Sequence, residues 1–160
     1  MRQRVLFGVI CLLAIPFLAW GEADPGSFRG IPWGSDIGQG TEFVVLREIR
    51  DFKICSRKGE GHQIDGVEVE EVRYEFYKNK FYSATVKFTG DRTFRSFFDS
   101  LFLGYGPPES RTKYSEEYEW SSHELNIILR YFQSEQNGSL EYLYKPIFDQ
   151  ITRDENCCTP

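Results

Sequence analysis

The side chains that could carry out chemistry are few and scattered along the chain. Only two histidines occur, His62 and His123. Ser121 and Glu124 flank His123, but such close sequence neighbours rarely face one another, and no nucleophile elbow surrounds the serine. No P-loop, GxGxxG, HExxH or EF-hand pattern is present either. We therefore predict no catalytic residue, no metal ligand and no cofactor. The alternative is a small hydrolase or thiol enzyme that uses Cys55 or His123.

The cysteines suggest a structural role instead. Three of the four follow residue 21, namely Cys55, Cys157 and Cys158. Adjacent cysteines seldom bond to each other, because the small ring strains the peptide between them. We expect a disulfide from Cys55 to Cys157 or Cys158, which would close a loop of roughly 100 residues and contribute ~2–5 kcal/mol. The odd number of cysteines also permits a link between two chains.

Residues 1–21 have the order of a secretory signal peptide. Two arginines precede an apolar run over residues 5–20, and small residues follow it. This run is shorter than the ~20 residues that a spanning helix needs. We therefore expect export, periplasmic or secreted, with cleavage after Gly21 or Ala23. Residues 22–160 would then form a single compact α+β domain, with an irregular N-terminal strap and a cysteine-containing C-terminal tail.

The charge of the mature chain limits its partners. Without the two arginines of the leader, about 17 basic side chains stand against 24 acidic ones. An acidic surface repels phosphate backbones, so general nucleic-acid binding is disfavoured. No basic amphipathic helix suggests membrane binding, so membrane contact is expected only through the leader. An unknown protein or small molecule of the cell envelope is the predicted partner, and the chain is predicted to be a non-catalytic binding module.

The densest local motif is Phe-Arg-Gly-Ile-Pro-Trp-Gly at residues 28–34. Its proline fixes one φ angle, its glycines permit positive φ, and its apolar residues can anchor a segment. We expect a strap that seals one edge of the core. The alternative is an aromatic platform in which Trp33, with Arg29 beside it, holds a ligand. Further ligand-binding candidates are the aromatic residues predicted to point outward: Tyr77, Phe81 and Tyr105.

The stretch from Val67 to Gly106 is the part that the rest of the chain must cover. Apolar and polar residues alternate on both sides of a short polar turn at residues 78–80, which is typical of a β-hairpin. A three-residue loop keeps the apolar residues of both arms on one face, whereas a two-residue loop divides them between the faces. We therefore predict the cross-strand pairs Phe76–Tyr82, Tyr74–Ala84 and Val72–Val86.

A helix is predicted after this hairpin, with Asp91 as its N-cap. Apolar residues then recur at i, i+3, i+4, i+7 and i+8, which is one face of a helix. Gly104 and the Gly-Pro-Pro run at residues 106–108 should end it. The apolar stripe comprises Phe94, Phe97, Phe98, Leu101 and Phe102.

The remaining pattern predicts further strands. Asn137-Gly138 separates two alternating runs, and this dipeptide is the strongest short-range signal for a hairpin turn. One closing helical turn is expected between Ile147 and Ile151. The predicted fold class is α+β: an antiparallel sheet built from hairpins, with one main amphipathic helix packed on it. The strands are expected at residues 42–55, 118–120, 125–131 and 140–144, although Leu46, Ile49 and Arg50 of the first stretch would also fit a helical turn.

The motif at residues 28–34, just after a signal peptide, resembles the opening of a family of small uncharacterised exported bacterial proteins. Those proteins continue with an aromatic hairpin, matched here by residues 74–81. They also have a Gly-x-Pro turn and an aromatic strand, matched by residues 105–108 and 118–120. The resemblance covers most of the mature chain, but its motifs are structural. It implies export and a single compact domain, and it implies no particular activity.

Overall fold

The computed structural model describes residues 26–38, 43–111 and 116–156. The predicted signal peptide, residues 1–21, lies outside the described residues, and so do Cys157 and Cys158. Among the helices of the described segments, none is long and apolar enough to cross a membrane.

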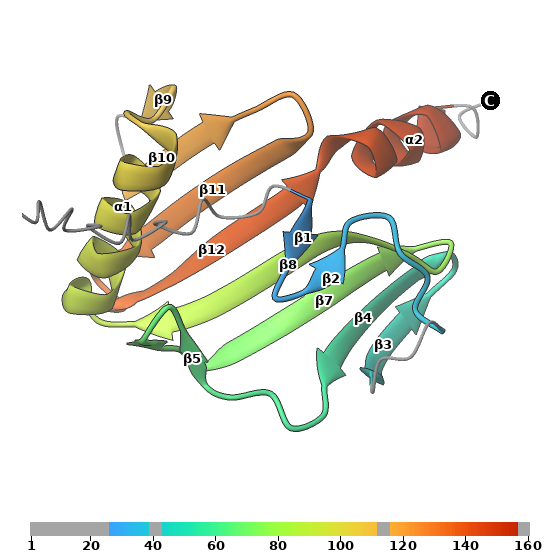
Figure 1. Cartoon of the computed structure of the whole chain (residues 1–160), viewed down its shortest axis with the longest axis horizontal. Coiled ribbons are helices and arrows are strands. Elements are labelled where there is room, and N and C mark those ends of the chain that lie inside the picture. The colour runs from blue at the N-terminus through green and yellow to red at the C-terminus, as the bar shows by residue number, and fades with distance from the viewer. Residues whose placement is uncertain (1–25, 39–42, 112–115, 157–160) are drawn as a thin grey trace, which may run out of the picture.

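Eight strands form one antiparallel sheet in the order β3-β4-β7-β8-β12-β11-β10-β9 (Figure 1). Each half of the sheet has four strands that follow chain order, and the halves meet where β8 pairs with β12. The fold is α+β, as the sequence predicts, with a mostly antiparallel sheet and a helix packed on it. The strands are β3 (Phe43–Ile49), β4 (Phe52–Arg57), β7 (Glu71–Tyr77), β8 (Lys80–Thr89), β9 (Ser110–Arg111), β10 (Glu116–Ser121), β11 (Leu125–Phe132) and β12 (Asn137–Tyr144).

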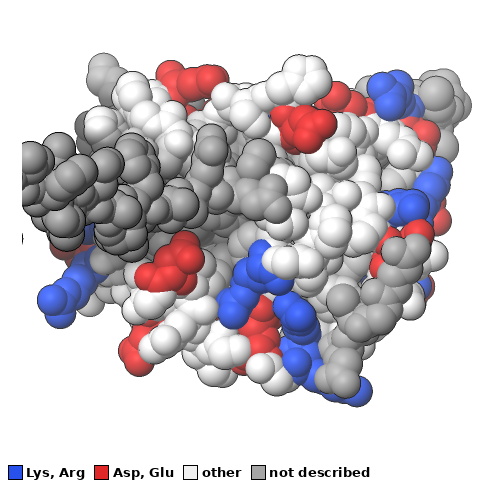
Figure 2. Space-filling model, in the orientation of Figure 1, with Lys and Arg blue, Asp and Glu red and all other residues white. Residues whose placement is uncertain are grey.

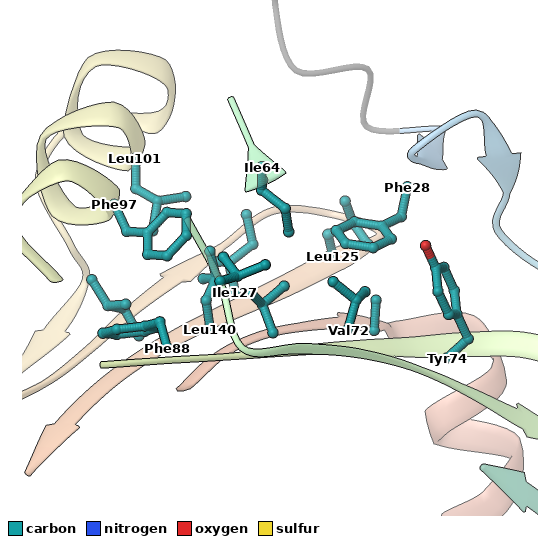
Figure 3. Close-up of a cluster of buried hydrophobic side chains, with 14 of the residues drawn as sticks. Phe28, Ile64, Val72, Tyr74, Phe88, Phe97, Leu101, Leu125, Ile127 and Leu140 are labelled. Atoms are coloured by element: carbon teal, nitrogen blue, oxygen red, sulfur yellow. The ribbon is translucent and has the colours of Figure 1, made fainter. Parts of the chain in front are cut away.

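The two faces of the sheet are covered by different elements. One face carries α2 (Lys145–Asn156), which packs through Ile147 and Ile151 against Tyr77 and Tyr82. Figure 3 shows the main core on one side of the sheet and α2 on the other. The other face, which carries the main core, is covered by helix α1 (Asp91–Tyr105), hairpin β1–β2 (Ser27–Phe28 and Ile31–Pro32) and hairpin β5–β6 (Gln63–Ile64 and Val67–Glu68).

Each helix packs across the boundary between the two halves of the sheet. Helix α1 follows β8, a strand of the first half, and lies against β11 and β12 of the second half as well as β8 (Figure 1). Its Phe94 ring stacks on Tyr131 with centroids 4.9 Å apart. Helix α2 follows β12, a strand of the second half, and lies against β8 and β12. The main core between α1 and the sheet includes Phe88, Phe97, Leu101, Ile127 and Leu140 (Figure 3).

The β7–β8 hairpin has a two-residue turn, so the predicted three-residue loop is wrong. Lys78 and Asn79 both have positive φ, 48° and 66°, as a type I′ turn requires. Phe76 consequently pairs with Phe81 rather than Tyr82. Tyr82 is the extra residue of a β-bulge, which shifts the register by one and returns the apolar residues to a common face. Beyond the bulge the other predicted pairs are confirmed: Tyr74 with Ala84 and Val72 with Val86.

Helix α1 occupies the predicted place, but its apolar face is less regular than the sequence pattern. Gly90, with φ 86°, takes the N-cap position, and the predicted N-cap Asp91 is the first helical residue. Phe102, expected in the buried stripe, is 46% exposed, and Leu103 beside it is 76% exposed. The helix is therefore not cleanly amphipathic. Its buried residues are Phe94, Phe97 and Leu101.

The predicted turn at Asn137-Gly138 is wrong, because both residues belong to β12 and the turn spans residues 133–136. Gly138 lies where the ring of Phe88 crosses the neighbouring strand. A Cβ atom added there would come 2.4 Å from Phe88 Cζ and 2.4 Å from the carbonyl oxygen of Arg130. Only glycine fits so close an approach between backbone and ring.

Two further elements are more developed than the sequence indicates. The stretch predicted as mainly strand over residues 42–55 contains most of the hairpin β3–β4, which turns at Arg50, where φ is 53°. The single closing turn predicted near the C-terminus is the 12-residue helix α2. The strap, predicted to be irregular, contains the short hairpin β1–β2.

Candidate functional site

Arg29 fastens the N-terminal strap to the body of the domain. It occupies the turn of hairpin β1–β2 with φ 51°, a conformation uncommon for residues other than glycine. The Arg29 Nε atom lies 3.1 Å from Glu60 Oε1. Its carbonyl oxygen accepts a hydrogen bond of 3.3 Å from Arg57 Nη1. Because the side chain and the carbonyl oxygen of Arg29 both have protein partners, these contacts favour the strap over a ligand site at this residue.

Glu60 also binds the core. The hydroxyl of the fully buried Tyr74 donates a hydrogen bond to Glu60 Oε1. Burial, together with the neighbouring carboxylate, raises the pKa of Tyr74, so this hydroxyl stays protonated and remains a donor. Glu60 lines a cavity of about 210 Å³, and His62 is among the other lining residues. Within the described segments, no group of histidines, cysteines and carboxylates is arranged to hold a metal ion.

The aromatic residues predicted to form an outward platform are mostly buried. Trp33 stacks on Phe81 with centroids 4.6 Å apart and an interplanar angle of 11°, and both belong to the core. Tyr77 is also buried, and its hydroxyl donates to Asp154 Oδ2 over 2.8 Å. The outward orientation predicted for Tyr77 and Phe81 is therefore wrong. Among the predicted aromatic candidates, only Tyr105 keeps partial access to solvent.

Tyr105 lines a cavity of about 200 Å³ at the C-terminal end of α1. Its apolar walls include Trp120, Leu125 and Ile127, all of which are buried. The Trp120 Nε1–H donates to the carbonyl oxygen of Gly106 over 2.8 Å, which fixes the indole. Burial raises the pKa of Tyr105. The sequence placed Tyr105 among the candidates, but nothing in the sequence pattern joined it to the other walls.

The residues of the alternative enzyme hypothesis are not assembled into a site. Cys55 is fully buried on the face that the strap covers, and burial is the main cause that raises its pKa to about 11. A thiol in this state is a poor nucleophile. The Ser121 hydroxyl accepts a hydrogen bond from Lys145 Nζ, while His123 lies exposed in the turn after β10.

Cys55 and helix α2, which precedes the two cysteines of the tail, lie on different faces of the sheet. Cys55 is a free thiol on the face that carries α1, whereas α2, which leads to the tail, packs on the other face. Since Cys157 and Cys158 lie outside the described residues, the bridge from Cys55 stays a prediction.

The outer edge of β3 is a feature that the sequence reasoning missed. This strand has seven residues and ends the sheet on one side, whereas the two-residue strand β9 ends it on the other. A register shift between Val45 and Arg47 interrupts its pairing with β4. A signal was present in the sequence, because Phe43–Leu46 is an unbroken apolar run at the start of a predicted strand. The exposed apolar residues of β3 are Val44 (39%), Val45 (46%), Leu46 (52%) and Ile49 (47%).

Charges are distributed without a dominant sign on the face that carries α1 and the strap. Figure 2 shows acidic and basic side chains interspersed around uncharged areas of this face. On the opposite face, Arg130 bridges two carboxylates, with distances of 2.7 Å to Glu117 and 3.0 Å to Glu141. Neither arrangement provides the basic stripe that a nucleic acid needs.

Together these features define an α+β domain with an antiparallel sheet, a fastened strap, an exposed apolar edge strand and a small aromatic-walled cavity. No protein-family model matches the chain, and it has no significant match among curated proteins or solved structures.

Proposed function

We propose that this protein is a non-catalytic, exported domain of the cell envelope that binds an extended segment of a partner protein along β3. The observation that carries the proposal is the exposed apolar edge of this strand. Natural sheets usually protect their edges with short strands, charges or covering elements, because the unpaired N–H and C=O groups recruit other strands. A seven-residue edge with four exposed apolar side chains is typical of a site for strand addition.

The register of β3 indicates what such a partner segment would contact. Val45 pairs with Cys55, whose side chain lies on the face that carries α1. Ile49 pairs with Phe52, which packs with α2 on the other face. An added strand would therefore place one apolar side chain beside Val45 and another beside Ile49, on opposite faces of the sheet. Main-chain hydrogen bonds would supply affinity, and these two positions would supply specificity.

Export is part of the proposal and is supported by the signal-like order of residues 1–21. The non-catalytic part is supported by the burial of Cys55 and by the hydrogen bond that the Ser121 hydroxyl accepts from Lys145. Both remain open to direct measurement. N-terminal sequencing of protein recovered from its native compartment should begin at Glu22 or Asp24. A chain that keeps Met1 in a membrane fraction would contradict export.

The binding proposal is tested with a displayed library of random, unstructured decapeptides selected on the mature protein. An enriched peptide should slow hydrogen exchange at the β3 amides and leave those of β9 unchanged. Val45→Lys places a charge on the edge without disturbing the core, because Val45 is half exposed. It should weaken binding at least about tenfold, since a lysine is a natural guard of sheet edges.

Phe132→Lys is the matched control, because Phe132 is 47% exposed and lies at the end of β11, far from this edge in the strand order. It should leave peptide affinity unchanged. Equal losses for the two variants would show that general hydrophobic contact explains the binding. Protection of amides elsewhere than in β3 would place the binding site on another surface.

A further inference from the structure

The cavity beside Tyr105 has the composition of a small-molecule site. Its walls are largely apolar, and they come from the end of α1, the segment that follows it, and strands β10 and β11. Ligand sites commonly combine such walls with a few polar groups that fix orientation. The lining residues with polar side chains here include Tyr105, Ser122 and Glu109.

The volume sets the size of the occupant. An apolar cavity of about 150 Å³ is sufficient for one benzene ring. The present cavity has about 200 Å³, so a single aromatic ring with a short substituent fits, and a ligand with two rings or a nucleotide does not. The Trp120 indole, fixed through its hydrogen bond to Gly106, offers a rigid aromatic wall.

Two polar side chains of the cavity have no hydrogen-bond or ion-pair partner within the described part of the chain. The Tyr105 hydroxyl makes no hydrogen bond there, and burial alone accounts for its raised pKa. The Glu109 carboxylate forms no ion pair with any described residue. Lys145 is close in the fold, since it donates to Ser121 and to the carbonyl oxygen of Ser122, but it does not line the cavity.

We propose that this cavity binds a small aromatic molecule with a short cationic substituent, such as an aryl-alkyl amine. The ring would lie against Trp120, Leu125 and Ile127. The ammonium group would lie near Glu109, and the Tyr105 hydroxyl would accept a hydrogen bond from it. A carboxylate in place of the ammonium is disfavoured by Glu109 and by the acidic net charge of the chain, −5. This site is separate from the β3 edge, so either proposal can fail without the other.

Benzylamine, benzyl alcohol and benzoate are the probes, because they share one ring and differ in charge. Each is titrated into the ¹⁵N-labelled protein while the Trp120 indole N–H signal is followed. Benzylamine should shift this signal saturably, with a dissociation constant on the order of millimolar, as expected for so small a ligand. Benzyl alcohol should bind more weakly, and benzoate should bind weakest.

Two variants separate the contributions of the polar groups. Tyr105→Phe keeps the ring and should weaken benzylamine about three- to tenfold, the range of one hydrogen bond. Glu109→Gln should weaken benzylamine several-fold and leave benzyl alcohol unchanged. Glu124→Gln is the matched control, because it removes the same charge from an exposed residue that does not line the cavity. It should change none of the three affinities.

Several results would overturn the proposal. One is the absence of a saturable shift at tens of millimolar benzylamine. Another is a shift of the Trp33 signal as large as that of Trp120, which would indicate non-specific contact. A third is an equal effect of Glu109→Gln and Glu124→Gln, which would reduce charge selectivity to the net charge of the protein. Unchanged signals from the rest of each variant establish that it is folded.

Discussion

Gly138→Ala is the substitution whose effect follows most directly from the geometry. The added methyl group would lie 2.4 Å from Phe88 Cζ and 2.7 Å from Phe88 Cε2, where van der Waals contact begins near 3.5 Å. Phe88 cannot retreat easily, because it is fully buried and its ring lies 5.2 Å from that of Phe97 and 6.4 Å from that of Tyr131. The second clash, with the Arg130 carbonyl oxygen, involves backbone and cannot be relieved by a rotamer change.

The magnitude is the balance of two terms. Overpacking a rigid core costs ~1–3 kcal/mol and occasionally more, and the backbone clash places Gly138 at the upper end of this range. Replacing glycine also reduces the entropy of the unfolded chain, which offsets ~0.4–1 kcal/mol. We expect Gly138→Ala to lower the free energy of unfolding by ~2–3 kcal/mol.

The assay is guanidinium denaturation followed by circular dichroism and tryptophan fluorescence. Gly104→Ala is the control, because Gly104 lies in α1 with no atom within 4 Å of an added Cβ. It should raise stability by ~0.5–1 kcal/mol, since alanine favours a helix over glycine. The same chemical change is thus expected to have opposite signs at the two positions.

A double variant identifies the cause. Phe88→Leu removes the ring atoms that clash, so in its presence Gly138→Ala should cost ~1 kcal/mol less than in its absence. A Gly138→Ala variant within ~0.5 kcal/mol of the parent would refute the close approach of ring and backbone. A cost that Phe88→Leu does not reduce would assign the clash to Arg130 alone.

Three further predictions concern the core, an acid and a thiol. Phe97→Ala should cost ~3–5 kcal/mol and Phe102→Ala less than half of that, because Phe97 is buried and Phe102 is 46% exposed; equal denaturation midpoints would mean that the α1 face is misread. Burial raises the pKa of Glu75 above its ordinary value of 4.5, so the folded state holds this proton more tightly than the unfolded state. The stabilisation from this bound proton is complete below about pH 4 and is lost as pH rises through the folded pKa. Glu75→Gln should therefore raise the free energy of unfolding at pH 7 and not at about pH 4. A difference between variant and parent that does not depend on pH would contradict this. After reduction, Cys55, whose pKa is about 11, should resist iodoacetamide at pH 8 until denaturant is added, and rapid labelling of the folded protein would revive the thiol-enzyme hypothesis.

The fold was predictable where local periodicity and tertiary packing agree. Alternation identified the arms of β7 and β8, and a helical stripe identified α1. The errors arose where the two disagree. The type I′ turn at Lys78 and Asn79 contains no glycine, so no local signal indicated two positive φ angles. At Asn137-Gly138 the glycine has a packing role against Phe88, which overrides its strong preference for a turn.

The candidate sites depended on contacts that no local pattern contains. The ion pair of Arg29 and Glu60 joins residues from separate hairpin and loop segments, and the cavity joins Tyr105 to strands β10 and β11. Local spacing cannot reveal such neighbours. The exposed edge of β3 is different, because the apolar run Phe43–Leu46 was visible and only the position of the strand in the sheet was unknown.

Each helix packs on strands of both halves of the sheet, and this arrangement has a consequence for unfolding. Each helix covers part of the half from which it does not come: α1 follows β8 and lies over β11 and β12 as well as β8, while α2 follows β12 and lies on Tyr77 and Tyr82 of the first half as well as on β12. If one half separated from the other, apolar residues of its sheet and of the helix attached to it would become exposed to solvent. Loss of either half therefore removes the reason for the other to stay ordered, and the chain should unfold in a single cooperative step, with amides of β8 and β12 among the last to exchange.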